Sequence, residues 1–287
     1  MTAKKLAIAA LVAALGINIP SEVSLAQSLG SLDQPAKSKK SSILKNDKFS
    51  ALDLQNLDPD QLAAIIAEQS LINPELAQSL LAQAISENPA IAKDLMTEVV
   101  SSITKQGGSG ATDLVKDVVA TAIKAAVESG GGGGADLVKD IVSAAVQGTS
   151  EGSAGGEVSQ DAIQGIVAAA VQTASETSGG GGEGADLVKD IVSVAIEVAS
   201  ATSDEGGAAD MIQAVTSGSI EAVLSTAADS EAAAELVQAT TSGAVEGAIA
   251  AADGDGDAAI ELVTATTAAV AASVTESAEA GDAVIEI

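Results

Sequence analysis

One ten-residue segment occurs twice in this chain, and this repetition constrains the fold more than any other feature. Gly134–Ser143 reads GADLVKDIVS, and Gly184–Ser193 repeats it without a change. Diverged copies begin near Gly110, Asp161, Asp210, Glu235 and Glu261, and with the two exact copies between them successive units are 23 to 26 residues apart. A single unit of that length cannot bury its apolar face alone, so we expect the units to stack and to share one continuous core.

Apolar residues in each unit recur with the period of an α-helix. In residues 135–147 they gather on one face, while charged and polar side chains occupy the other, without the strict alternation of a strand. The positions predicted to form the core and to determine assembly are Leu137, Val138, Ile141, Val142, Leu187, Val188, Ile191 and Val192.

The repeats therefore predict an all-α protein. We expect tandem single-helix repeats of about 24–25 residues, stacked antiparallel as an α-solenoid or an elongated helical bundle. A β-solenoid is the alternative, because the period and the glycine-rich joints between the units would also suit its rungs.

Residues 1–26 have the pattern of a cleavable signal peptide. Lys4 and Lys5 precede an apolar stretch from Leu6 to Ile19, and Ser24–Ala26 supplies small residues for a signal peptidase. About 14 apolar residues are too few to span a bilayer, which needs roughly 20. We therefore expect an exported protein, in the periplasm or outside the cell at its surface, with no stable membrane insertion after cleavage.

Two further segments precede the glycine-jointed repeats of residues 107–287. Residues 27–57 are rich in Lys and Ser and predict a flexible, locally basic leader, or else a docking arm for an acidic polymer. In residues 58–106, three prolines each directly follow an Asp or Asn residue. An Asx side chain caps the free N–H groups of a helix and proline fits its first position, so this segment predicts three short helices.

The missing residue types exclude most enzyme chemistry. The 287 residues include no His, Cys, Trp, Tyr or Arg, and Phe49 is the one aromatic residue. Without His and Cys, the chain lacks the side chains that titrate near neutral pH and the soft ligands of metals. Without aromatic rings, and with a net charge of −27, it is also unsuited to nucleic acid. We therefore expect no enzyme activity, no cofactor and no nucleic-acid partner.

Acidic residues in the C-terminal third raise the question of a cation. Residues 190–287 contain 18 acidic residues and no basic one. Asp253, Asp255 and Asp257 resemble the start of an EF-hand loop, and these three residues are the candidate ligands of a weak Ca²⁺ site. Ala258 replaces the glycine of that loop and Thr264 replaces its bidentate Glu, so an inter-helix turn is the favoured interpretation.

The sequence as a whole favours an exported, non-enzymatic structural or interaction protein. We expect it to associate with copies of itself in a surface layer, a filament, a matrix or a periplasmic scaffold, because a stack of thin alanine-rich helices is marginal as a monomer. Two alternatives stay open. One is an acidic protein whose binding depends on Ca²⁺, and the other is a coat of a hydrophobic particle.

Overall fold

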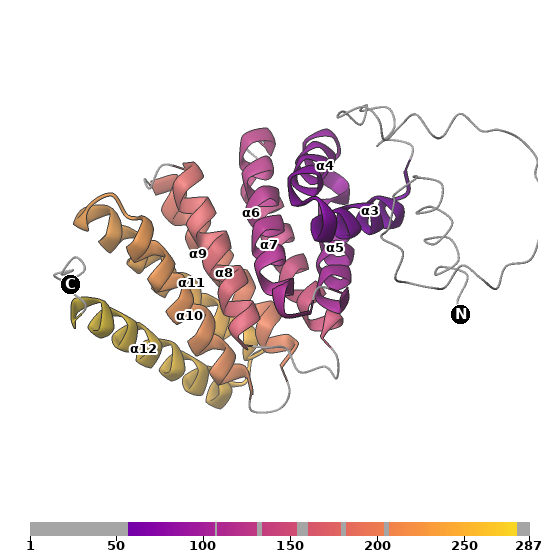
Figure 1. Cartoon of the computed structure of the whole chain (residues 1–287). Helices are drawn as coiled ribbons and strands as arrows, with labels where there is room; N and C mark the ends of the chain where they lie inside the picture. Colours follow the sequence, from indigo (N-terminus) through magenta and orange to yellow (C-terminus); the bar gives the residue numbers. More distant parts are fainter. Residues whose placement is uncertain are drawn as a thin grey trace, which may run out of the picture. The chain divides into compact units, whose positions relative to one another are not determined.

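A computed structural model describes residues 57–106, 108–130, 134–153, 160–178, 182–203 and 207–279 (Figure 1). The predicted signal peptide and residues 27–56 of the predicted leader lie outside these ranges. The α-helices are α3 (Pro59–Ile72), α4 (Pro74–Glu87), α5 (Ala92–Gln106), α6 (Ala111–Gly130), α7 (Gly134–Gly152), α8 (Gln160–Ser178), α9 (Gly182–Ala201), α10 (Gly207–Thr226), α11 (Ser230–Ala251) and α12 (Gly256–Glu279). Two short 3₁₀ helices are η3 (Pro89–Ile91) and η4 (Gly108–Gly110). No strand occurs in the described ranges, so the all-α prediction is confirmed and the β-solenoid alternative is wrong there.

Two of the three predicted Asx–Pro helix starts have the expected form. The Asp58 carboxylate accepts the Asp60 N–H at the start of α3, and the Asn73 amide oxygen accepts the Leu76 N–H at the start of α4. The third start differs, because the Asn88 side chain makes no capping hydrogen bond and Pro89 begins the 3₁₀ helix η3. The α-helix there therefore starts later than predicted, with α5.

The helices lie in two layers in which each helix contacts the helix two places further along the chain. The helices α3, α5, α7, α9 and α11 form what we call the odd layer, and α4, α6, α8, α10 and α12 form the even layer. The structural unit is thus a pair of helices, one from each layer. This explains why the two identical segments are 50 residues apart: they begin α7 and α9, which are neighbours in the odd layer.

The two layers bury the predicted apolar face between them. Of the eight predicted core residues, seven are buried: Val138, Ile141 and Val142 in α7, and Leu187, Val188, Ile191 and Val192 in α9. The exception is Leu137, which is half-buried. The core becomes thinner towards the C-terminus, because α5 buries Leu, Met, Ile and Val side chains, whereas α11 buries mainly Ala, Gly and Thr. We therefore expect the last helices to be the least stable part of the stack.

Glycines let some neighbours in the odd layer approach very closely. A Cβ atom at Gly148 of α7 would lie 2.6 Å from the carbonyl oxygen of Thr97 in α5, and one at Gly247 of α11 would lie 2.6 Å from that of Ser193 in α9. Real Cβ atoms do not come so near to backbone, so these positions accept no side chain without a shift of the helices. The repeats thus pack glycine faces against the preceding helix of the layer.

Candidate functional site

Three lysines, two of them in the repeated motif, link successive helices of the odd layer. The Lys93 ammonium lies 3.7 Å from the Asp140 carboxylate, and the Lys139 ammonium lies 3.5 Å from that of Asp190. The Lys189 ammonium lies 2.7 Å from the Glu246 carboxylate of α11. Each lysine therefore pairs with an acidic side chain of the next helix in its layer. The paired side chains are between about one third and one half exposed, so we expect each pair to contribute little to stability and more to the register of the helices.

The protonation of these lysines reflects their partners. The hydrogen bond that the Lys139 ammonium donates to Asp136 is the main cause that raises the pKa of Lys139, with a smaller contribution from the charge of Asp190. Glu246 raises the pKa of Lys189, chiefly through its hydrogen bond. Both shifts favour the charged ammonium, so these lysines stay cations and are not poised to act as bases or nucleophiles at neutral pH.

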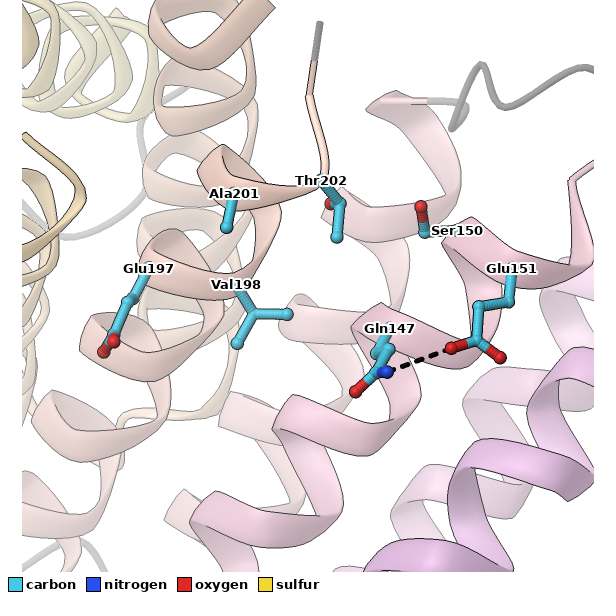
Figure 2. A pocket seen from close by; sticks show the side chains of 7 residues that line it. All are labelled: Gln147, Ser150, Glu151, Glu197, Val198, Ala201 and Thr202. Carbon is cyan, nitrogen blue, oxygen red and sulfur yellow. Dashed lines mark hydrogen bonds between the residues drawn. The ribbon is translucent and has the colours of Figure 1, made fainter.

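A shallow hollow opens between α7 and α9, where the odd layer lacks its glycine contact (Figure 2). Val198 of α9 stands at the repeat position of Gly148 and Gly247 and lines this hollow. The hollow has a volume of about 370 Å³ and is bordered by Gln147, Ser150, Glu151, Glu197, Val198, Ala201 and Thr202. The larger side chain thus holds the two helices apart.

The polar side chains of this hollow do not converge on one point. The Gln147 amide donates a hydrogen bond of 2.9 Å to the Glu151 carboxylate, which satisfies part of that acid. Figure 2 shows Glu151 and Glu197 on opposite sides, so the two carboxylates do not converge on one point. No basic side chain lines the hollow. A paired acid and base or an activated nucleophile, which catalysis would need, is not assembled here.

A second hollow lies on the even layer, across α6, α8 and α10. It has a volume of about 360 Å³, and its floor consists of glycine and alanine residues of α8 and α10. Its polar side chains include Lys116, Asp161, Gln164 and Glu221. The mixture of one cation, two anions and amides is typical of a solvated helix surface and specifies no ligand chemistry.

The acidic turn between α11 and α12 works as a helix cap. The Asp255 carboxylate accepts the N–H groups of Asp257 at 2.9 Å and of Ala258 at 3.2 Å. Asp253 has a positive φ of 46° and Gly254 one of 85°, which gives the chain its sharp reversal. In the part of the chain that is described, no three acidic side chains gather closely enough to share a metal ion. The Ca²⁺ site at Asp253, Asp255 and Asp257 therefore stays a prediction.

Exposed apolar side chains gather at the two ends of the stack. Among the residues described, the large apolar side chains that are exposed are Leu71 (41%) and Ile72 (58%) in α3, Ile249 (54%) in α11 and Ile260 (69%) in α12. Sequence patterns alone did not single out these four residues, because burial at an end depends on which helix follows. Helix α12 also contains a 20-residue stretch that is long and apolar enough to cross a membrane and is mostly uncovered.

The sequence was also compared with known proteins. No protein-family model and no curated protein matches it.

Proposed function

We propose that the protein is an exported, non-enzymatic repeat protein that associates with copies of itself in a surface layer, a filament, a matrix or a periplasmic scaffold. The described residues form a stack of helices whose interior is filled with apolar and small side chains. The hollows on its surface are open, and their side chains do not form a recognisable catalytic or ligand-binding group. These features support a mechanical and associative role over a chemical one.

The observation that carries the proposal is the exposure of apolar side chains at both ends of the stack. Terminal units of a soluble solenoid normally have a polar outer face, which keeps the ends from sticking together. Here Ile72 at one end and Ile249 and Ile260 at the other are more than half exposed. Each buried Ile side chain contributes roughly 1.5–3 kcal/mol, so covering the ends is favourable.

The uncovered face of α12 also favours, as a second candidate, the coating of a hydrophobic particle. In its 20-residue apolar stretch, Asp257 and Glu261 are the charged residues. Such a helix would bury its apolar face in an interface instead of in another protein. The strongly negative net charge of the chain would direct this binding to uncharged surfaces.

Light scattering and electron microscopy of the purified protein over a wide concentration range test the proposal. We expect the average mass to rise with concentration above that of one mature chain, and ordered particles to appear. Mass equal to one chain at every concentration would contradict self-association. The same samples with uncharged lipid vesicles test the coating alternative, and samples with millimolar Ca²⁺ or with a chelator test the dependence on calcium.

A further inference from the structure

We infer that the α11/α12 end of one copy binds the α3/α4 end of a second copy, so that the stack continues from chain to chain. This inference rests on the proposed function, because it names the surfaces and the partner of the self-association. The partner is a second copy of this chain, joined head to tail.

The side of α11 that faces away from α9 repeats a surface that is covered elsewhere in the layer. In α9 the corresponding positions contact α11: Gly243 lies against the Lys189 backbone, and Gly247 lies against Ser193 and Ile196. Counting from the acidic residue of each repeat, Lys189, Ser193 and Ile196 correspond in α11 to Gln238, Ser242 and Val245. We call these three residues and Ile249, one turn further along α11, the forward stripe.

None of the described helices covers the forward stripe. Ile196 of α9 is fully buried, whereas its counterpart Val245 is half-buried and Ile249 is 54% exposed. Gln238 replaces the lysine that pairs with the next helix in α7 and α9, so the stripe carries no charge. Because the stripe is uncharged and Val245 and Ile249 are apolar, packing against another helix is more favourable than exposure to water.

Helix α12 presents the matching surface in the even layer. In this layer the Lys116 side chain of α6 lies against Gly165 of α8, and the Gln164 side chain of α8 lies against Gly218 of α10. The equivalent position in α12 is Thr264, which is exposed. Exposed positions that follow it at helical spacing are Ala268, Ala271 and Thr275. This side of α12 is therefore also uncharged and uncovered.

The threonine hydroxyl groups on this side of α12 are hydrogen-bonded within their own helix. The Thr264 hydroxyl donates to the Ile260 carbonyl at 2.6 Å, and the Thr275 hydroxyl donates to the Ala271 carbonyl at 2.7 Å. With their hydroxyl protons directed at their own helix, the methyl groups of these threonines are left to make contacts. The side of α12 thus behaves as a small, apolar surface.

The order and direction of the helices allow a second copy to continue both layers. The described part of the chain has ten α-helices, an even number, so a following α3 falls in the odd layer after α11 and a following α4 falls in the even layer after α12. Contacts such as Lys189 with Gly243, and Ile196 with Gly247, show that α9 and α11 run parallel. We expect a docked α3 that continues this pattern to run parallel to α11.

This parallel arrangement brings the exposed apolar side chains of the two ends to the same level. Leu71 and Ile72 close the C-terminal end of α3, and Ile249 stands near the C-terminal end of α11. Ile260 stands near the N-terminal end of α12, which follows α11 through a short turn. All four side chains would therefore meet in one apolar cluster, which explains why the exposed residues occur at these places.

Charge opposes contacts between the ends of the stack, so the apolar cluster has to supply the affinity. From Asp190 onward the chain has no basic residue, so two α11/α12 ends would repel each other. Helices α3 and α4 likewise carry acidic residues and no lysine: Asp60, Glu68, Glu75 and Glu87. Salt should therefore strengthen the head-to-tail contact by screening this repulsion. Such a head-to-tail contact leaves one end free at each step and can build filaments.

Two end variants and one matched control test this arrangement. Ile72→Glu should block the α3/α4 end and Ile249→Glu the α11/α12 end, because each places a carboxylate in the apolar cluster. Ala250→Glu adds the same charge to the neighbouring, exposed position of α11 and serves as the control. Circular dichroism of each variant establishes that the helices are retained, and sedimentation velocity measures the mass.

We expect wild type and Ala250→Glu to form long assemblies and each end variant alone to be a monomer. A mixture of the two end variants should form a 1:1 dimer and nothing larger, because each variant keeps the end that the other lacks. If wild type assembles but both end variants still assemble, or if the mixture stays monomeric, the head-to-tail contact is wrong. If Ile72→Glu alone forms dimers that Ile249→Glu abolishes, the contact joins two identical ends. Wild type that is monomeric throughout would overturn the proposed function as well.

Discussion

The backbone of Lys189 in α9 lies so close to Gly243 in α11 that a methyl group at position 243 would overlap the Lys189 carbonyl oxygen. The same lysine pairs through its ammonium group with Glu246, one turn further along α11. A single residue of the repeat thus fixes both the separation of two helices and their register. Where the next contact glycine, at the repeat position of Gly247, is replaced by Val198, the layer opens into the hollow of Figure 2.

Replacing the contact glycine should loosen this interface. We expect Gly243→Ala to destabilise the packing of α9 against α11 by about 1–3 kcal/mol, because the added Cβ meets backbone that cannot rotate away. Thermal unfolding followed by circular dichroism, together with hydrogen exchange of the α11 amides, measures the effect. Gly182→Ala is the control, since its Cβ would meet nothing nearer than a Glu235 carboxylate oxygen at 3.9 Å. Equal stability of the two variants would contradict the close approach.

A buried hydroxyl group in α11 should be dispensable. The Thr240 hydroxyl is fully buried and makes no hydrogen bond, so it carries the cost of desolvation without compensation. We expect Thr240→Val to stabilise the protein by about 1 kcal/mol. Thr266→Val in α12 is the matched variant, because the Thr266 hydroxyl donates to the Leu262 carbonyl at 2.9 Å. We expect this variant to be stabilised less than Thr240→Val, or to be destabilised. Denaturation curves of both variants decide the matter, and a larger gain for Thr266→Val would refute this account.

Glu68 should make stability depend on pH. Partial burial raises the pKa of Glu68 above its ordinary value of 4.5, so the folded protein holds this proton more tightly than the unfolded chain does. The protein therefore loses stability as the pH rises from about 4.5 through the raised pKa. Glu68→Gln removes the charge and should stabilise the protein at pH 7, with a benefit that disappears below pH 4.5. Glu98→Gln, at an exposed position of α5, is the control for net charge. A benefit of Glu68→Gln that did not change with pH would contradict the burial of the charge.

The acidic turn should respond to the loss of its cap more than to calcium. We expect Asp255→Ala to destabilise the start of α12 by about 1 kcal/mol, because two N–H groups lose their acceptor. Asp255→Asn keeps the cap and should have little effect on stability. Titration calorimetry with Ca²⁺ separates the two roles. If wild type binds Ca²⁺ and Asp255→Asn does not, the turn is a cation site as well as a cap.

The sequence predicted helices correctly because each unit keeps its apolar residues on one face, as Val138, Ile141 and Val142 do. It predicted the capped starts at Asp58 and Asn73 because capping is a local interaction. Asn88 shows the limit of that local pattern, since the same Asn–Pro pair begins a 3₁₀ helix there.

The layered arrangement was beyond the reach of the sequence pattern. A period of about 25 residues describes one helix, but the packing neighbour is the second helix along, as the pairing of Lys139 with Asp190 shows. The role of Gly247 could not be predicted either. A glycine inside a helix permits a close approach only where another backbone lies beside it, and the sequence does not show which backbone that is. The exposure of Ile249 likewise depends on which helices lie beside α11, and the sequence pattern does not specify them.

Disulfide cross-linking tests the joining of the two ends most directly, because the chain contains no cysteine of its own. Ile72→Cys and Ile249→Cys each introduce one thiol, and the two variants are mixed under mild oxidation. The head-to-tail stack predicts a mixed disulfide dimer that forms faster than the dimer of Ile72→Cys with Ala250→Cys. Mixed dimers no faster than this control, or rapid dimers of Ile249→Cys with itself, would contradict the account.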